Sequence, residues 1–485
     1  MLLERENSRL HTRLQELSEK LAHAEGKDAA SLQLEIAHLK ETLANRNRAI
    51  FGPSSEKRPR TDVPAKTKDA EAKRGHGPSE QPELPIVEVV HELDEPDKVC
   101  PSCGGQLAEM DGQFEEAEEI EIVERSFQIT RHKRKKYSCK CGGCVDTALG
   151  PPKLIPGGRY SIGFATAVAI AKYADHMPLA RQVRQMLRAG LTVTTQTLWD
   201  QLFALSKHLE PTYEALHAHV LTNPVVGADE TTWRLMEANR PKTWWAWSVT
   251  STDTVYYHIH PSRSAEAAAA ILRDYSGIVI CDGYTAYSAL RKNRAATRDG
   301  PPPFTLAHCW AHVRRKFIEA EPHDPRASQM LNLIGKLYEV EAEARASSNG
   351  DLHERRAELR DARSRESVAE IRRWMLEQRA LPGSSLGKAI RYTDGIWQGL
   401  IRFLENPAVD LDNNATERTM RSVAVGRKNH HGSKSLRGTR VAAIFYSLIE
   451  SAKLAGVEPS AYIREATRRA IEAPGTVTLP ADLTE

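Results

Sequence analysis

Apolar residues recur at alternating three- and four-residue steps over the start of the chain and then stop. The positions of this seam are Leu3, Leu10, Leu14, Leu17, Leu21, Leu32, Ile36, Leu39 and Leu43. The spacing predicts a coiled coil over residues 1–45, and polar Asn7 at a seam position commonly fixes the register. A single amphipathic helix packed on its own domain is the alternative. We expect self-association, because the polar segment that follows offers this helix no apolar surface.

Helical periodicity returns at Leu179–Gly190 and Thr194–Leu209, on either side of a short turn. The polar residues Thr194, Thr195 and Gln196 open the second helix. In a helix-turn-helix, the second helix presents its N-terminal residues to a DNA groove, so we expect residues 151–222 to bind DNA in this way. An ordinary pair of packed helices has the same pattern and is the alternative.

Short apolar and alternating runs predict strands in the centre of the chain. These runs are 225–233, 243–250, 254–260, 277–281 and 304–308. An alanine-rich helix at 264–275 follows the third run, and a helix at 310–318 follows the fifth. This order of strands and helices is that of an RNase H-like α/β core. The charged, helical composition of about 319–385 predicts an α-helical insertion in it.

Acidic residues stand where two of these strands end. Asp229 follows the run that begins at Val225, and Asp282 follows the run that begins at Gly277. A predicted helix further on carries Glu417 in its first turns. Three carboxylates share one pocket only if cations neutralise them, and carboxylate oxygens suit Mg2+ or Mn2+. A pair of such ions can clamp a phosphodiester, so these acids are candidate catalytic residues.

Other acidic residues near these three have simpler explanations. Glu230 follows Asp229, but successive strand side chains point to opposite faces, so only one of them faces the pocket, and we favour Asp229. Asp274 lies in the alanine-rich helix, where a cap or a solvent-exposed role is expected. Asp412 or Asn413 is placed to cap the helix of Glu417.

His308 and His312 stand four residues apart, as in the HExxH helix of zinc hydrolases. Cys309 does not supply the glutamate that serves as general base in that motif. We therefore expect a neutral histidine packed near the pocket and no catalytic zinc.

Composition is that of an ordinary soluble protein, with 40% hydrophobic and 27% charged residues and a net charge of +3. Residues 46–85 are rich in Pro, Gly, Ser, Lys and Arg and predict a basic disordered linker. We find no transmembrane run and no secretory signal, and expect a cytoplasmic protein. Basic residues also follow two of the candidate catalytic segments. As DNA-backbone contacts we predict Arg314, Arg315, Lys316, Arg418, Arg421, Arg427 and Lys428, with a solvated basic face as the alternative.

Cysteines crowd into one segment. Cys100 and Cys103 have the spacing of a zinc knuckle. The second pair of zinc ligands would come from Cys139, Cys141 and Cys144, one more cysteine than a four-ligand site needs. Spacing favours Cys141 and Cys144, with Cys139 as substitute. Because the chain lacks an export signal, metal is favoured over disulfides, and residues 86–150 predict a structural Zn2+ module.

Several blocks in order resemble the insertion sequence 66 family of bacterial transposases. They are CPSCGG, LIPGGRYS, GADETTW, CDGYTAY, HCWAHVRRKF and DNNATERTMRSVAVGRKN, and the resemblance runs from the N-terminus to about Pro459. It implies an RNase H-like domain at 223–455 with a DDE triad, whose members map onto Asp229, Asp282 and Glu417. The Cys-Lys-Cys-Gly-Gly-Cys run differs from the plain pair usual in the family, which leaves the fourth zinc ligand open.

The resemblance further implies metal-dependent cleavage and strand transfer on double-stranded DNA, at element ends and target, in association with the bacterial nucleoid. Small accessory transposition proteins are expected partners, together with a second copy of the chain. A catalytically silent zinc-containing DNA-binding protein and an RNase H-like nuclease are the alternatives. No function is expected for the tail at 456–485.

Overall fold

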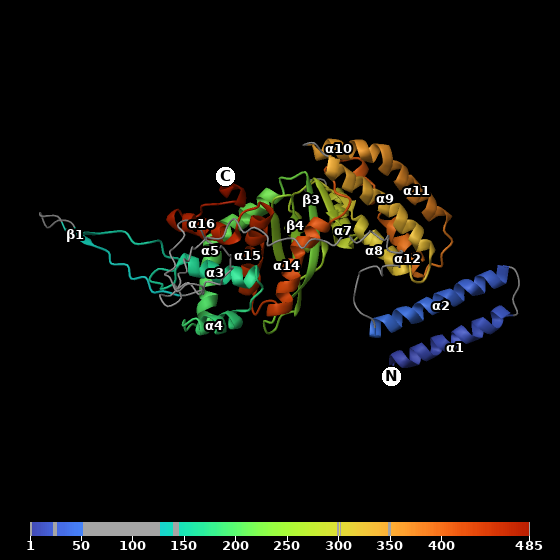
Figure 1. Cartoon of the computed structure of the whole chain (residues 1–485), viewed down its shortest axis with the longest axis horizontal. Coiled ribbons are helices and arrows are strands. Elements are labelled where there is room, and N and C mark those ends of the chain that lie inside the picture. Colours follow the sequence, from blue (N-terminus) through green and yellow to red (C-terminus); the bar gives the residue numbers. More distant parts are fainter. Residues whose placement is uncertain are drawn as a thin grey trace, which may run out of the picture. The chain divides into compact units, whose positions relative to one another are not determined.

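The computed structural model describes residues 2–22, 27–51, 127–138, 145–297, 300, 302–347 and 351–484 (Figure 1). It divides into two compact units, one formed by Met1–Glu56 with Phe127–Glu485 and the other by Lys57–Ser126. The second unit lies outside the described residues, as do most of the predicted linker and all five candidate zinc ligands. Among the helices that are described, none is long and apolar enough to cross a membrane.

The N-terminal seam forms two helices that contact each other, α1 (Leu2–Ala22) and α2 (Lys27–Phe51). Its buried members among the described side chains are Leu17, Ile36 and Leu43. The two halves of the seam thus pack on each other within one chain. A coiled coil between two copies stays a prediction.

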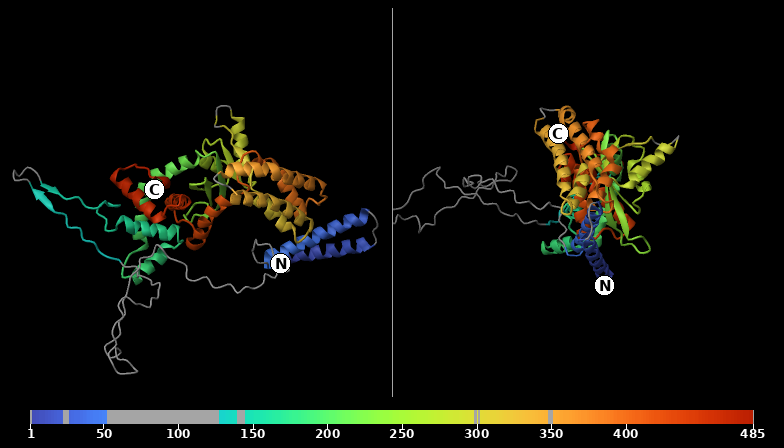
Figure 2. Two further views of the ribbon diagram at one scale, coloured as in Figure 1. Left: turned by 45° about the horizontal axis from the view of Figure 1, so that its top comes forward. Right: turned by 90° about the vertical axis from the view of Figure 1, so that its right-hand side faces the viewer.

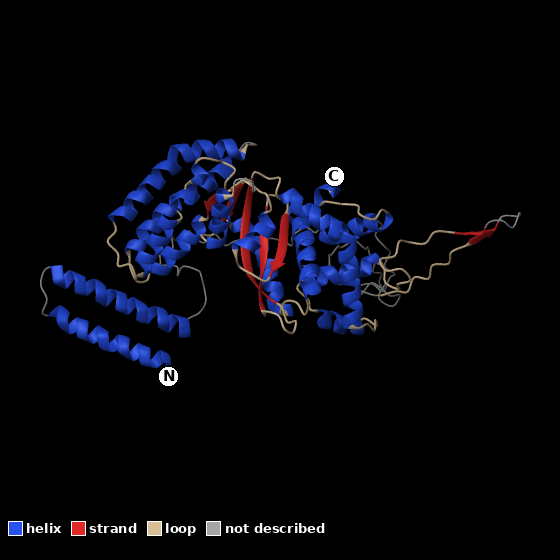
Figure 3. Cartoon of the chain, turned by 180° about the vertical axis from the view of Figure 1, so that it is seen from behind, coloured by secondary structure: helices blue, strands red, loops and turns tan. Residues whose placement is uncertain are grey.

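A five-stranded sheet forms the centre of the fold, in the order β5-β4-β3-β6-β7 (Figure 3). Its strands are β3 (Val225–Arg234), β4 (Thr243–Thr250), β5 (Val255–His260), β6 (Ile278–Cys281) and β7 (Thr305–His308). The first three pair antiparallel, while β6 and β7 run parallel to β3. All five predicted strands are confirmed: burial alternates along most of β3, whereas β4 and β6 are buried over most of their length, which agrees with their apolar runs.

Helices from both ends of the chain pack on this sheet. The C-terminal helices α14 (Asn414–His430) and α15 (Leu436–Leu454) contact β3 and β5, respectively. The helices α3 (Ile162–Tyr173) and α16 (Pro459–Glu472) contact α5 (Thr195–Val220), which itself contacts β5. Their apolar side chains and those of the sheet form one continuous buried cluster. The tail is thus part of the core.

The predicted helix pair before the sheet is present as α4 (Leu179–Arg188) and α5. Gly190 between them has φ +80°, a conformation that glycine adopts without a Cβ clash. The second helix runs to Val220, eleven residues beyond its expected end at Leu209. It continues through Pro211 because its later turns are buried in the core, which outweighs the hydrogen bond that proline cannot make.

The segment predicted as a helical insertion, about 319–385, is helical, and helices continue on both sides of it. The helices of this region are α8 (Trp310–Ala320), which was predicted separately at 310–318, α9 (Arg326–Ser347), α10 (Leu352–Leu359), α11 (Arg365–Glu377), α12 (Ser385–Gly395) and α13 (Trp397–Leu400). These helices bury a second apolar cluster. They are drawn in yellow to orange in the left view of Figure 2, where they lie together as a bundle. A buried ion network, in which Glu341 pairs with Arg356 at 3.0 Å and Arg360 at 2.7 Å, fastens α9 to the following turns.

Two further helices contact the central sheet, and two short strands form a sheet of their own. The helices α6 (Ala265–Leu272) and α7 (Thr285–Ala296) contact each other and the strands β4 and β7, respectively. The strands β1 (Lys136–Ser138) and β2 (Val145–Thr147) pair antiparallel away from the central sheet.

Candidate active site

Asp229 and Asp282 occupy equivalent register positions along the neighbouring parallel strands β3 and β6. Gly227 of β3 pairs with Ile280 of β6, and each aspartate follows two residues later. Since side chains two residues apart share a face of the sheet, both carboxylates project from the same side of adjacent strands. The strand-end position predicted for Asp229 is wrong, because Asp229 lies inside the ten-residue strand β3. Asp282 does stand just beyond the end of β6.

Helix α14 crosses that same face of the sheet. A Cβ built on Gly227 would lie 2.0 Å from Thr416 Oγ1, so the helix reaches the strand only because this residue is glycine. The side-chain Nδ2 of Asn413 donates a hydrogen bond of 2.9 Å to the carbonyl oxygen of Ala228. Glu417 follows Thr416 in the first turn of α14, next to the strand that carries Asp229.

Asp229 is partly buried and lies near several other carboxylates. Burial, together with the negative charges of Glu230, Glu417 and Asp282, raises the pKa of Asp229 from 3.8 to about 7. The backbone N–H of Glu230, 2.9 Å from Asp229 Oδ1, opposes this shift only in part. A carboxylate held among other carboxylates in this way favours either a proton or a bound cation.

Glu230 faces the opposite side of the sheet. Its Oε1 accepts hydrogen bonds from Arg263 at 2.9 and 2.6 Å, and its Oε2 accepts one of 3.0 Å from Tyr287 of α7. The side chain is nearly inaccessible, with 1% exposed. Glu230 therefore has a complete set of partners away from α14, whereas Asp229 shares its face with Glu417.

The other acids weighed from sequence lie in unremarkable places. Asp274 is exposed after α6. Asp412 Oδ1 accepts the backbone N–H of Asn414 at 3.0 Å, and so satisfies an amide at the start of α14. Asn413 stands at the N-cap position, but its side chain bonds Ala228 instead of capping the helix.

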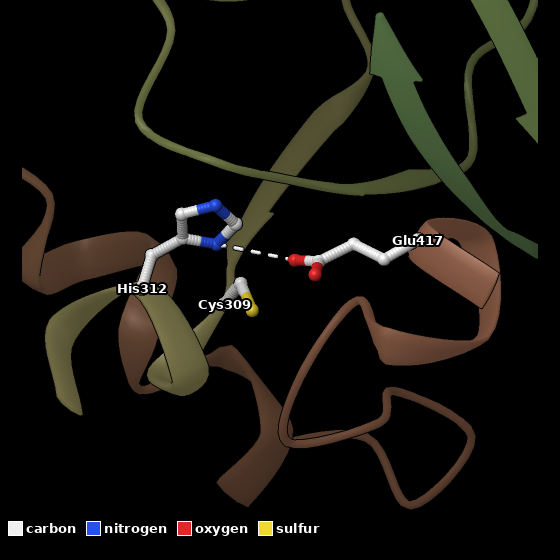
Figure 4. A group of neighbouring side chains, drawn as sticks. All are labelled: Cys309, His312 and Glu417. Carbon is white, nitrogen blue, oxygen red and sulfur yellow. Dashed lines mark ion pairs between the residues drawn. The ribbon is translucent and has the colours of Figure 1, made fainter. Parts of the chain in front are cut away.

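A second group of side chains meets Glu417 from the side of α8. His312 Nδ1 lies 3.6 Å from Glu417 Oε1, and Arg315 lies 3.8 Å from Glu417 Oε2. Cys309, the residue before α8, joins them, and its sulfur lies within 4.8 Å of the other two ligand atoms (Figure 4). Sequence reasoning missed this group. The signal was Cys309 and His312 three residues apart, which places both on one face of a helix start.

His308 ends a strand and His312 lies on a helix, so the two do not share a helix face as the histidines of the zinc-hydrolase motif do. His308 ends β7, and its Nδ1 lies 3.8 Å from the buried sulfur of Cys281. Burial lowers the pKa of His308, which agrees with the expected neutral histidine packed near the pocket.

The basic residues of α14 that were predicted to contact DNA differ in their exposure and in their hydrogen bonds. On α14, Arg418, Arg421 and Lys428 are exposed. Arg427 donates hydrogen bonds to the hydroxyls of Thr231 and Thr232 and thereby ties α14 to β3.

The basic residues of α8 are partly buried. Arg314, Arg315 and Lys316 follow His312 on this helix, and Lys316 also pairs with Glu319 at 3.2 Å. Arg315 thus lies beside Glu417, and part of its side chain is also exposed to solvent.

The predicted groove-reading residues stand at the start of α5. Thr194 caps this helix, since its hydroxyl accepts the backbone N–H of Thr197 at 3.1 Å. Thr195 and Gln196 are exposed, although Gln196 also donates to Asp200 at 2.8 Å. The structure gives Thr194 a local role and leaves Thr195 and Gln196 accessible.

Two family models match the chain. The one described as "Transposase IS66 family" matches residues 157–441, which include Asp229, Asp282 and Glu417. The one described as "zinc-finger binding domain of transposase IS66" matches residues 97–142 and stops before Cys144.

Curated relatives occur in Sinorhizobium fredii (strain NBRC 101917 / NGR234). Uncharacterized protein y4jD is 31% identical over 410 residues, which are 81% of this chain and 78% of the relative. Uncharacterized protein y4qI is 30% identical over 398 residues, covering 79% of this chain and 72% of the relative.

Proposed function

This chain belongs to the IS66 family of transposases, and we propose that it acts as a DNA-strand transferase with an RNase H-like catalytic core. Water-driven hydrolysis at the ends of the element frees a 3′-hydroxyl, which then attacks a phosphodiester of the target DNA. The sheet order supports the fold assignment, since three antiparallel strands are followed by two parallel ones on the far side of β3.

One observation carries this proposal. The strand β3 pairs with β6 and is contacted by α14, so the elements that carry Asp229, Asp282 and Glu417 are neighbours, and burial together with the charges of Glu230, Glu417 and Asp282 raises the pKa of Asp229 to about 7. Asp229, Asp282 and Glu417 are the acids that the family's DDE triad maps onto. Three neighbouring elements, separated by long stretches of chain, each carry one of these acids, which a structural cap would not require.

The acids fit a pair of hard divalent cations. Carboxylate oxygens are the ligands that Mg2+ and Mn2+ prefer, and Oε1 of Glu417 is buried with no hydrogen-bond partner. Asp229, Asp282 and Glu417 would hold the ions, which when bound activate the attacking oxygen and stabilise the leaving one.

The chain's own groups position these ligands. Asn413 and Arg427 fasten α14 to β3 at two points along the helix, and so hold Glu417 beside Asp229. The backbone N–H of Tyr284 donates a hydrogen bond of 2.9 Å to Asp282 Oδ1 and so orients that carboxylate. Preorganised ligands of this kind lower the reorganisation needed when the reaction begins.

DNA would be held by exposed groups around these acids. Arg418, Arg421 and Lys428 lie along the outside of α14, where they can neutralise phosphates. Thr195 and Gln196 at the start of α5 would contact a groove, and the zinc-finger domain would add end recognition. Self-association through α1 and α2, and small accessory proteins, complete the proposed assembly.

A supercoiled plasmid that carries candidate element ends, incubated with the protein and Mg2+, tests the proposal. Joined products are expected. Nicks without joining would identify a nuclease, and a gel shift without breaks would identify a DNA-binding protein, so either result contradicts strand transfer.

Asp282→Asn sharpens this test. Replacement of one ligand carboxylate should abolish metal-dependent cleavage and joining, while thermal unfolding and binding to the ends stay unchanged. Asp274→Asn is the matched control, since Asp274 is exposed, and should keep full activity. Joining by the Asp282 variant would refute the assignment of the acids.

A further inference from the structure

Cys309, His312 and Glu417 bring three different ligand types to one point. The sulfur, His312 Nδ1 and a carboxylate oxygen of Glu417 all lie within 4.8 Å of one another. In Figure 4 the imidazole and the carboxylate point toward each other, with the sulfur beside the gap. Among the residues that the structure describes, these are the Asp, Glu, His and Cys side chains that gather closely enough for a common ion.

Two of these atoms are buried without a hydrogen-bond partner. They are His312 Nδ1 and Glu417 Oε1. The 3.6 Å between them exceeds a hydrogen bond. The two atoms form an ion pair when His312 is protonated, and with a neutral imidazole their lack of a hydrogen-bond partner suits a ligand shared between them.

The separation fits a metal centre. From zinc–ligand bond lengths, neighbouring nitrogen and oxygen ligands of a tetrahedral zinc lie about 3.3–3.5 Å apart. The His312–Glu417 distance is already close to this, and the sulfur needs to move by no more than about 1 Å.

The surroundings of the sulfur suit a metal-bound thiolate. The backbone N–H of Asn413 lies 3.2 Å from Cys309 Sγ and donates to it. Cys309 also stands at the N-cap of α8, where the helix dipole favours negative charge. Burial raises the pKa of the free thiol to about 12, so an arriving cation displaces its proton to solvent.

We propose that Cys309, His312 and Glu417 form a site for a thiophilic divalent cation of the zinc class. Mixed sulfur, nitrogen and oxygen ligands select such ions over Mg2+. Three protein ligands leave a fourth position open for water or another group.

The site shares Glu417 with the proposed catalytic pair. An ion bound to Cys309 and His312 takes up a Glu417 oxygen, so it competes with the hard cations and inhibits strand transfer. This consequence rests on the proposed function, whereas the metal site itself does not.

Cobalt binding to the full chain tests the site without DNA. The protein is first given a single equivalent of Zn2+, which the proposed four-cysteine module takes up before a site with three mixed ligands and then keeps, because zinc binds more tightly than cobalt. Titration with Co2+ should then add one equivalent with a sulfur-to-cobalt charge-transfer band. Cys309→Ser and His312→Gln should each remove the band and weaken Co2+ binding more than about 100-fold, beyond the loss expected for an outer-shell change.

Cys281→Ser is the matched control. Cys281 is also buried and free, and it also lies near a histidine, but without a carboxylate in a common group. This variant should keep the cobalt band. Absence of the band in the Zn2+-loaded wild type, or its persistence in both Cys309→Ser and His312→Gln, would overturn the proposal. Should the serine variant not fold, the glutamine variant decides, because His312 is partly exposed.

Discussion

Asp229 and Glu230 are adjacent carboxylates with opposite environments. Glu230 is neutralised by Arg263 and bonded by Tyr287, while Asp229 faces the negative charges of Asp282 and Glu417. The pleat of one strand is enough to separate a structural acid from a candidate catalytic one. At the residue scale, the consequence is a dependence of stability on pH.

Asp229→Asn should change this dependence in Zn2+-loaded protein without Mg2+. The folded pKa is raised from 3.8 to about 7, so the stability contribution of Asp229 is complete below about 4 and is lost as pH rises through 7. Wild type should therefore lose stability over this range by a few kcal/mol, since each pKa unit is about 1.4 kcal/mol, and the variant should lose less. Denaturant unfolding at pH 5 and pH 8 measures the difference.

Mg2+ provides the control for that experiment. At pH 8 it should restore stability to wild type more than to the asparagine variant, because the ion neutralises the clustered acids. Identical pH profiles for the two proteins would contradict the shift, and Asp274→Asn should follow wild type.

At the element scale, the fit of α14 on β3 decides whether the acids meet. The helix approaches the strand at Gly227, is bonded to it by Asn413 and is tied further along by Arg427. The helical insertion lies before α14 in the chain, and its Arg356 holds Asp410 at 2.6 Å just before the helix begins. The position of Glu417 thus depends on contacts of β3 and of the insertion.

Gly227→Ala should push α14 away from β3. The Cβ of the alanine would lie 2.0 Å from Thr416 Oγ1. We therefore expect stability to fall by about 1–3 kcal/mol and joining activity to fall roughly 100-fold. Gly335→Ala in α9 is the control, because a Cβ there meets nothing within 4 Å. It should stabilise the helix by about 0.5–1 kcal/mol and leave activity unchanged. Wild-type joining by the Gly227 variant would show that the contact is not needed.

At the scale of the whole molecule, the body and the zinc-finger domain are separate pieces of chain. The central core is built from elements between α3 and the last turns of the chain, whereas the zinc-finger match covers residues 97–142. Of that match the structure describes residues 127–138, among which Phe127 packs against the core and residues 128–137 are exposed.

Removal of Zn2+ by a chelator should therefore act on DNA binding more than on the core. We expect end binding in a gel-shift assay to weaken, while the main calorimetric unfolding transition stays at its temperature, because metal binding is coupled only to the folding of its own module. Zinc content measured alongside verifies the removal. A loss of the main transition would mean that the core depends on the module.

The sequence alone determined the elements and the candidate acids. Short apolar and alternating runs predicted the strands, helical spacing predicted α4 and α5, composition predicted the helical insertion, and local motifs marked Asp229, Asp282 and Glu417. These signals are readable because they arise from the periodicity of one segment at a time.

Only the tertiary structure decided what those segments meet. It placed Asp229 and not Glu230 beside α14, paired the two halves of the N-terminal seam, extended α5 through Pro211 and added Cys309 and His312 to Glu417. Each outcome depends on contacts between residues far apart in sequence. Local periodicity does not encode such contacts, because burial and close approach are set by the packing of whole elements.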